Sequence, residues 1–206
     1  MQNMARGAAA VGGALVIALV LGGRSVTAWP APCDFMTGGG FILTTASGQH
    51  AEDKANFGVG GGCKDGSPTW GHLEYIDHAT GLNVHWTSIT AYMPEGDGAG
   101  DTSSDPKTGQ PTGTRLICGV ARTNQYGDVD FMVRAKDNGE PGDTDEFDIR
   151  LAQNGHVIYT TENEPGAPNK LGGGMGGGGN IQLHKPNPST NGNFGGSCPA
   201  RAAVFP

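Results

Sequence analysis

The sequence predicts an all-β protein, an antiparallel β-sandwich-like domain of about 7–9 short strands. The 37 glycines and 13 prolines interrupt every window long enough for an amphipathic helix. Short runs rich in β-branched and aromatic residues alternate with turn residues along most of the chain. Within Leu82–Tyr92, apolar Leu82, Val84 and Trp86 alternate with polar neighbours, the period expected of a half-buried strand.

Nine segments are expected to form strands, and the third and fourth make the clearest hairpin. They are joined by His78-Ala79-Thr80-Gly81, in which Gly81 supplies the positive φ that a short hairpin turn needs. The expected strands are 41–45, 55–59, 72–77, 82–92, 115–122, 129–136, 146–151, 156–160 and 180–184.

The segments outside these strands have little apolar surface to order them. Residues 93–113 and 161–179 are rich in Gly, Asp, Ser and Pro, so we expect mobile loops there. The tail 186–206 is rich in Pro, Asn and Gly and is expected to be irregular, held at Cys198. The core of the domain is therefore expected within about 36–185.

The N-terminus predicts export. Arg6 precedes an apolar run, Ala8–Leu21, and a small-residue stretch follows that ends at Ala28. This order is typical of a signal peptide, and the run is shorter than the ~20 residues of a spanning helix. Residues 1–28 are therefore expected to be cleaved, leaving a single secreted, periplasmic or cell-surface domain over 29–206. The alternative is an uncleaved N-terminal anchor.

The charge favours a soluble exported protein. The whole chain has a formal charge of −7, and loss of residues 1–28, with two arginines and no acid, takes it to −9. An acidic surface argues against nucleic acid and anionic membranes as partners. No second long apolar run follows, so no membrane insertion is expected after cleavage. The possible partners are a cell-surface component or a polysaccharide.

Four cysteines in an exported chain indicate two disulfides. Four cysteines allow three pairings, and the sequence does not choose among them. We favour Cys33 with Cys198, which would tie the two ends, and Cys63 with Cys118. The rival pairs Cys33 with Cys63, because these two flank the first expected hairpin.

Six short pieces of the chain, in order, resemble one known family. The pieces are Gly38–Ile42, Ala55–Val59, Gly71–His78, Val84–His85, Asp137–Gly142 with Phe147, and Gly179–His184. In order and spacing they are similar to the post-choice-of-anchor (post-COAP) domains of bacterial secreted and surface proteins. The resemblance covers about residues 36–185 and implies an antiparallel β-sandwich-like module. It implies no established activity and no catalytic residues.

An acidic stretch between the sixth and seventh expected strands is a candidate calcium site. Calcium prefers six to eight oxygen ligands, which closely spaced carboxylates on a bent loop can supply. The competing interpretation is a plain turn, because Asn-Gly and Pro-Gly are turn pairs in their own right. The candidate ligands are Asp137, Asn138, Glu140, Asp143 and Asp145. Calcium is the cofactor that this stretch suggests.

A second, weaker metal candidate lies on the central hairpin. His72 and Glu74 are two residues apart on one strand and so share a face, and His85 lies on the partner strand. Two histidines and a carboxylate can bind a transition metal. The alternative is a cross-strand polar pair of Glu74 and His85 on a solvated face.

Three function classes remain open. A non-enzymatic extracellular module with a structural, adhesive or ligand-binding role is favoured, because no nucleophile elbow and no metalloprotease motif occur. The first alternative is a secreted metal-dependent enzyme that uses His72, Glu74 and His85. The second is a carbohydrate-binding module, in which Trp70, Trp86 and Tyr75 would stack on sugars unless they pack the core.

Overall fold

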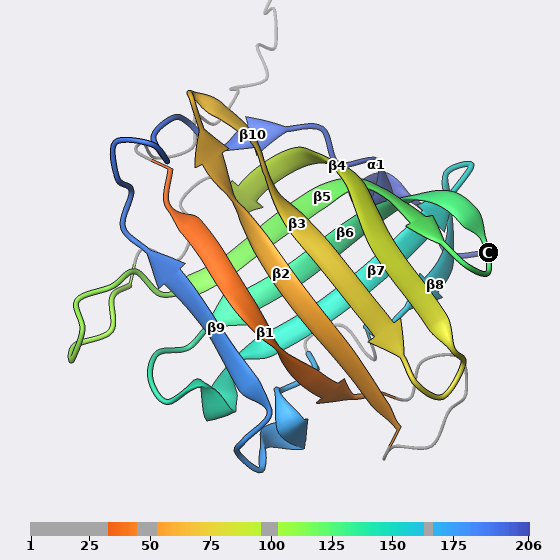
Figure 1. The fold of residues 1–206 in the computed structure, drawn as a ribbon, viewed down its shortest axis with the longest axis horizontal. Coiled ribbons are helices and arrows are strands. Elements are labelled where there is room, and N and C mark those ends of the chain that lie inside the picture. Colours follow the sequence, from red (N-terminus) through yellow and green to blue (C-terminus); the bar gives the residue numbers. More distant parts are fainter. Residues whose placement is uncertain (1–32, 45–52, 96–102, 163–166) are drawn as a thin grey trace, which may run out of the picture.

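The computed structural model describes residues 33–44, 53–95, 103–162 and 167–206, so the expected signal peptide lies outside the described residues. Figure 1 shows an antiparallel β protein, which confirms the predicted fold class. The strands are β1 (Phe35–Leu43), β2 (Lys54–Lys64), β3 (Ser67–Asp77), β4 (Leu82–Pro94), β5 (Gly113–Thr123), β6 (Gly127–Asp137), β7 (Glu146–Gln153), β8 (His156–Thr160), β9 (Gly179–His184) and β10 (Gly195–Gly196). The described residues also form a short α-helix, α1 (Pro199–Ala202), and two 3-10 helices, η2 (Gly142–Thr144) and η3 (Gly172–Gly174).

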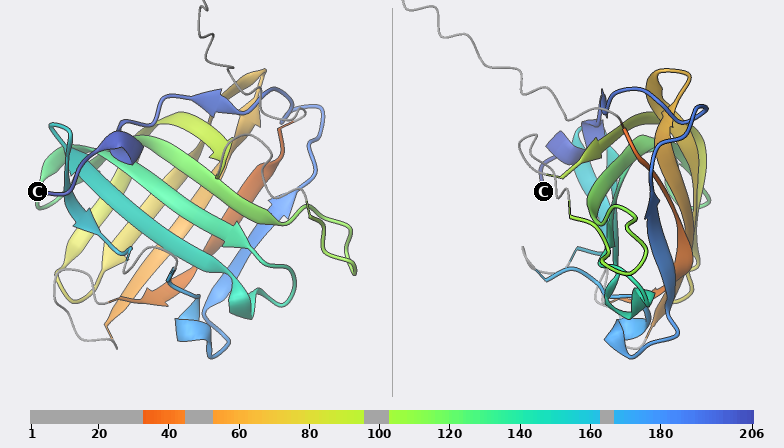
Figure 2. Two further views of the ribbon diagram at one scale, coloured as in Figure 1. Left: turned by 180° about the vertical axis from the view of Figure 1, so that it is seen from behind. Right: turned by 90° about the vertical axis from the view of Figure 1, so that its left-hand side faces the viewer.

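The strands form one continuous sheet and not two separate ones. Its order is β8-β7-β6-β5-β4-β3-β2-β1-β9, with β10 paired to β4. Consecutive strands pair antiparallel from β1 to β8, and β9 returns to pair with β1. The sheet curls strongly, so that β9, β1, β2 and β3 face β5, β6 and β7 across the interior (Figure 2).

The strands extend further than the sequence predicts, mostly through glycine. β1 begins at Phe35 and runs through Gly38, Gly39 and Gly40, which pair in register with β2. β3 begins at Ser67, five residues before the expected start, and passes through Gly71. Glycine disfavours an isolated strand, yet here its neighbours on both sides hold it in the ladder.

The main hydrophobic core lies inside the curl. Side chains alternate between its interior and the outer surface, so Leu73 and Tyr75 of β3 are fully buried while their neighbours are exposed. The rings of Phe57 and Phe147 stack with centroids 3.8 Å apart and join β2 to β7 across the interior. Such aromatic contact fixes the spacing of the two halves.

A second hydrophobic cluster lies outside the curl, over β4 to β7. β5 is buried on both faces along most of its length, as its continuous apolar run Leu116–Val120 requires. The tail covers this surface, which corrects the expectation that it is held only at Cys198. The cluster consists of Ala91, Met93, Leu116, Cys118, Met132, Ala152, Val157, Ala200 and Ala203.

The disulfides are Cys33–Cys63 and Cys118–Cys198, so the pairing favoured from the sequence is wrong and the rival Cys33–Cys63 bond is formed. The physical reason is the strand period. Cys63 faces the interior and Cys118 the outer cluster, so these two lie on opposite sides of the sheet. The Cys118–Cys198 bond instead fastens the tail to β5. Two disulfides fit an extracellular or periplasmic protein.

The described parts of the two long loops pack against the sheet. Asp105, in the first loop, is nearly buried and accepts a hydrogen bond from the Glu140 amide. Leu171, in the second loop, is fully buried, and its amide donates to the Asp145 carbonyl. Residues 96–102 and 163–166 of these loops lie outside the described residues.

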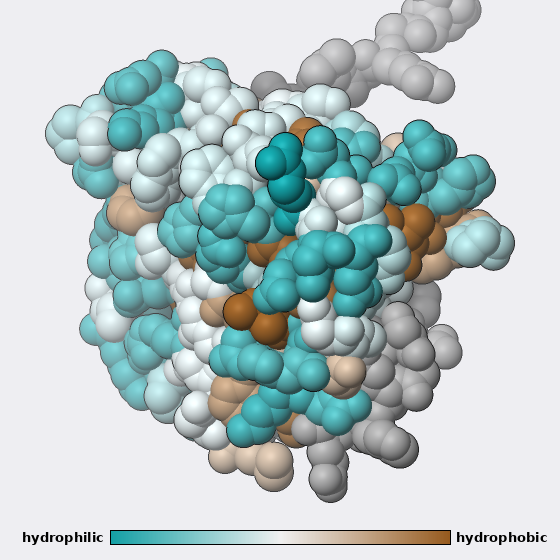
Figure 3. All heavy atoms as spheres, turned by 45° about the vertical axis from the view of Figure 1, so that its right-hand side comes forward, coloured by the Kyte–Doolittle hydropathy of each residue, from teal (hydrophilic) through white to brown (hydrophobic). Residues whose placement is uncertain are grey.

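Within the described residues no helix is long and apolar enough to cross a membrane. The surface seen in Figure 3 is mostly hydrophilic, with hydrophobic residues in small separate patches. Isolated apolar residues of this kind are normal on protein surfaces.

Candidate functional site

The five expected calcium ligands do not converge. Asp137 ends β6 and Asp145 precedes β7, and both are buried, whereas Asp143 and Asn138 are exposed. Glu140 accepts a hydrogen bond from the Asn180 amide group, at 3.1 Å. Among the described side chains, no group of three or more His, Cys, Asp or Glu is placed to hold a metal ion.

The two buried carboxylates instead bind the open edge of β9. Asp145 Oδ2 accepts from the Ile181 amide at 2.8 Å, and Asp137 Oδ2 accepts from the Leu183 amide at 2.7 Å. Their second oxygens accept from the amides of Asn138 and Gly139. β9 pairs with β1 on its other side, so these side chains satisfy amides that a ladder partner would otherwise take. We call this contact the seam.

Burial of the seam raises the pKa of both of its carboxyl groups. Burial raises the pKa of Asp145 to about 6, although the hydrogen bonds from Asn138 and Ile181 act to lower it. Burial also raises the pKa of Asp137. Asn180 Oδ1 is buried without a hydrogen-bond partner and lies against Gly142 beside Asp145 Oδ2. Both oxygens would meet a Cβ on Gly142, at 2.2 and 2.7 Å, so any larger residue there would have to displace these two side chains.

The second metal candidate is a surface pair. Glu74 and His85 face each other in the β3–β4 ladder, and His85 Nδ1 hydrogen-bonds Glu74 Oε1. Both side chains are more than half exposed. The His72 ring lies over Gly60 of β2, one ladder row away. The structure therefore has the cross-strand pair that was the alternative interpretation, without a third ligand beside it.

Buried polar side chains inside the curl are paired with one another. Tyr159 donates to Asp77 at 2.9 Å, and its hydroxyl lies 2.6 Å from that of Tyr75. Burial raises the pKa of both tyrosines, so their hydroxyls stay protonated. A buried ion pair of Asp34 and Arg115 is likewise hydrogen-bonded. Buried polar side chains are usually hydrogen-bonded in this way, so we interpret these groups as structural contacts.

The outward surface of β9, β1, β2 and β3 carries a row of rings, and we call this surface the open face. Phe35 of β1 stacks on His184 of β9, with centroids 4.6 Å apart and planes at 17°. Trp70 of β3 meets Phe35 edge-on at 6.4 Å. His184 Nε2 lies within hydrogen-bond distance of Thr37 Oγ1, at 2.9 Å. The row therefore runs across the ladder from β9 to β3.

Four glycines of the open face, Gly39, Gly58, Gly60 and Gly62, form what we call the glycine strip. A Cβ on Gly62 would stand 2.6 Å from Phe35 Cβ and 3.4 Å from the Trp70 ring, so this glycine lets the side chains lie close to the strand. Gly60 does the same for His72. A Cβ on Gly58 would meet nothing within 4 Å, so the backbone there is bare to solvent.

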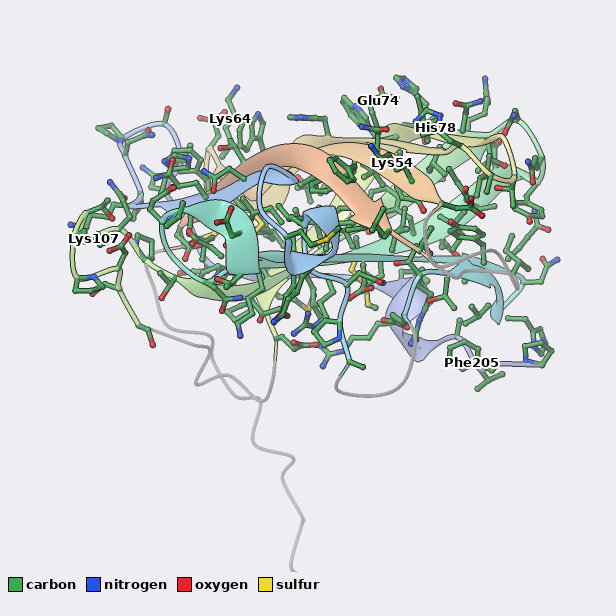
Figure 4. The ribbon with its side chains drawn as sticks, turned by 90° about the horizontal axis from the view of Figure 1, so that it is seen from below. Lys54, Lys64, Glu74, His78, Lys107 and Phe205 are labelled. Atoms are coloured by element: carbon green, nitrogen blue, oxygen red, sulfur yellow. A yellow bond between two sulfur atoms is a disulfide. The ribbon has the colours of Figure 1, made fainter. Side chains whose placement is uncertain are left out.

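The charge of the open face differs from that of the chain. The only carboxylates on β9, β1, β2 and β3 are Asp77, which is buried, and Glu74, which faces outward to His85. Lys54 and Lys64 stand at the two ends of β2, and Figure 4 shows them on the same side as Glu74, opposite Phe205. Lys54 Nζ lies 4.6 Å above the Phe41 ring. The acidic excess of the protein is therefore located elsewhere.

A shallow depression on the other half of the sheet is the main competing surface. It carries two aspartates and no aromatic ring, so it offers no stacking surface. Its lining residues are Val120, Asp128, Val129, Asp130, Ala152, Gln153 and Asn154.

Sequence reasoning found only part of the open face. Of the three aromatics expected to stack on sugars, Tyr75 is fully buried and Trp86 packs against the main core. Trp70 alone reaches the ring row. Phe35 and the stacking of His184 were missed, because the first strand was expected to begin at Phe41. The signal was present in the alternation of Phe35, Thr37 and Gly39 on one face of an extended strand.

The chain was compared with protein families, curated proteins and solved structures. None of the three comparisons gave a match. The case for a function therefore depends on the geometry of the open face.

Proposed function

We propose that this chain is an extracellular, non-enzymatic binding module whose open face binds carbohydrate. The observation that carries the proposal is the row of His184, Phe35 and Trp70, which stand on β9, β1 and β3 and span four neighbouring strands of the sheet, with Gly62 of β2 between Phe35 and Trp70. Aromatic rings offer an apolar surface to the C–H face of a sugar, while a polar tip can hydrogen-bond its hydroxyls. The ring row combines both properties.

The polar neighbours of the rings support the same ligand class. Thr37 and Gln182 lie in the next ladder row, opposite each other on β1 and β9, and both are partly exposed. Hydroxyl and amide side chains can both donate and accept, as a sugar hydroxyl does. A rigid β-sheet holds these groups in place before binding, which lowers the entropy cost of association.

The remaining sequence observations fit this role. A signal peptide over 1–28 would deliver the domain to the compartment in which its two disulfides persist. The resemblance to post-COAP domains implies an accessory module on exported proteins, for which surface polysaccharide is an accessible partner. A purely structural or adhesive role without a sugar ligand is the competing proposal.

The enzyme alternative receives less support from the geometry. Glu74 and His85 form an exposed pair, and His72 lies a ladder row away over Gly60. Enzyme sites combine such groups with a water-excluding pocket and oriented supporting residues. The neighbouring strand β2 has glycine at three outward positions, so it contributes no side chains that could form such a pocket around the three groups.

Affinity electrophoresis of the exported protein through gels that contain one polysaccharide each would test the proposal. We expect retardation by at least one polysaccharide and its loss in Trp70→Ala, with an unchanged thermal midpoint. Phe205→Ala is the matched control, because Phe205 is 57% exposed and lies on the opposite side (Figure 4). Equal retardation of Trp70→Ala and the parent would contradict a role for the ring row.

A further inference from the structure

We infer that the ligand of the open face is a linear, anionic polysaccharide, one that carries carboxylates, and that it lies along β2. This inference rests on the proposed function and adds to it the charge of the ligand and its direction on the sheet. Three observations carry it: the charge of the face, the glycine strip and the position of the two lysines.

Charge complementarity selects an anionic ligand. The protein is acidic overall, with 20 Asp and Glu against 13 Lys and Arg. On the four strands of the open face, however, the outward charged side chains are Lys54, Lys64 and Glu74, and the His85 contact occupies Glu74. Asp53 and Asp65 lie just beyond the ends of β2. The two lysines attract a carboxylated ligand to this face, and the outward carboxylate on its strands is already paired with His85.

The position of the lysines selects an extended ligand. Lys54 and Lys64 are the first and last residues of β2 and point to the same face. Ten residue steps in a strand separate their Cα atoms by about 33 Å. A single sugar or a disaccharide is too short to contact both. A polymer with regularly spaced carboxylates can contact both at once, and the two contacts then reinforce each other.

The glycine strip gives that polymer a path. Outward positions of β2 between the lysines are Asn56, Gly58, Gly60 and Gly62, so three of the four carry no side chain. Rings lie close to the strand over Gly60 and Gly62, and Gly58 is bare. A chain laid along β2 therefore meets rings at one end and open backbone in the middle. Phe41, in contact with Lys54, provides a ring at the other end.

Matched ligands test the charge directly. Polygalacturonate and alginate are each compared with their esterified forms, which keep the backbone of the polymer and remove its charge. Binding of the exported protein is measured by titration calorimetry at low and at high salt. We expect both acidic polymers to bind, esterification to weaken binding about tenfold or more, and salt to weaken it because exposed charges are screened.

Matched variants test the path. Lys54→Ala with Lys64→Ala should weaken binding to the acidic polymers about tenfold. Lys107→Ala with Lys170→Ala, which removes two exposed lysines that lie on none of the four strands of the open face, should change binding only slightly. Gly58→Gln should abolish binding at an unchanged thermal midpoint, because a Cβ there contacts nothing in the folded protein.

Each result has one interpretation. Equal binding of acidic and esterified polymers, or binding of neutral polysaccharides alone, would overturn the anionic ligand while leaving a carbohydrate-binding function in place. Binding that survives Gly58→Gln would overturn the path along β2. Absence of binding to polygalacturonate and alginate would overturn the inference, and absence of binding to every polysaccharide would overturn the proposed function as well.

Discussion

The two halves of the sheet present opposite outer surfaces. Over β4 to β7 the outward side chains are apolar, and the tail covers them through Ala200 and Ala203 and the Cys118–Cys198 bond. Over β9, β1, β2 and β3 the outward positions carry rings, histidines, two lysines, Glu74 and glycines. Most of them are partly or fully exposed, although Gly60 and Gly62 are buried beneath the neighbouring rings. The outer surface of β4 to β7 is therefore covered by the protein's own tail, while that of β9, β1, β2 and β3 is available to a ligand.

The difference shows how the strand sequences decide what becomes of each surface. In β5 both alternate sets of positions are apolar, so each face of the strand needs a cover. In β2 the inward set is apolar and the outward set is glycine or polar, so only one face needs cover. The open face is consequently stable without a partner, as a binding surface in a soluble protein must be.

The largest expected effect comes from releasing the tail from the outer surface of β4 to β7. Replacing Cys118 and Cys198 together by alanine should lower the free energy of unfolding by about 4 kcal/mol, because the bond closes a long loop in the unfolded chain. The variant should also bind a hydrophobic dye, since the tail no longer stays fixed over the outer cluster. Chemical denaturation measures the first effect and dye fluorescence the second. A variant as stable as the parent would show that the tail adds nothing to the fold.

The seam should give the next largest effect. In Asp145→Ala the amides of Asn138 and Ile181 lose their acceptor, at about 1–3 kcal/mol for each amide left buried and unpaired. Denaturant unfolding measures the loss, and exposed Asp143→Ala in the same loop is the matched control with no large effect. Chelators and millimolar calcium should leave both proteins unchanged. A melting temperature that depends on calcium in the parent would restore the calcium site that the sequence suggested.

The strands and the seam show which features could be predicted from the sequence and which could not. Alternation and turn residues located the nine main strands, because those signals are local. Asp137 and Asp145 were among the candidate calcium ligands, and the structure shows their carboxylates bound to amides of β9. Their partners Leu183 and Ile181 are 46 and 36 residues away, and nothing local reveals that β9 joins β1. The disulfide pairing failed for the same reason.

A smaller effect is expected from pH. Burial raises the pKa of Asp148 to about 7 and that of Asp145 to about 6, both above the value of an unfolded aspartate. A carboxyl group whose pKa is raised on folding binds its proton more tightly in the folded state than in the unfolded state. The free energy of unfolding should therefore increase as the pH falls from about 7 towards 4. We expect the thermal midpoint at pH 5 to exceed that at pH 8 by a few degrees, as an order of magnitude.

Asp148→Asn is the variant that sharpens the pH prediction. Asn169 and Thr161 donate to Asp148 Oδ1, and an asparagine carbonyl can still accept from both. The substituted protein should therefore fold, with a smaller gain in midpoint between pH 8 and pH 5. An unchanged gain would assign the pH dependence to other groups.

The smallest expected effect is at Gly58. Gly58→Ala should change the free energy of unfolding by no more than about 0.5 kcal/mol, the usual range for a surface position. Gly62→Ala should cost more, because its Cβ would stand 2.6 Å from Phe35 Cβ. Thermal unfolding of the two variants side by side measures the contrast. If Gly58→Ala lost as much stability as Gly62→Ala, the fold would require glycine at both positions, although a Cβ on Gly58 meets nothing within 4 Å.

The most direct test of a carbohydrate-binding open face is an amide and indole NMR spectrum of the exported protein, recorded while oligogalacturonate is added. The account predicts shifts in the indole N–H of Trp70 and in the amides of β1, β2, β3 and β9. The indole of Trp86, which packs against the core, and the amides of β5, β6 and β7 should stay in place. Shifts centred on Asp128, Asp130 and Gln153, in the depression on the other half, would contradict the account.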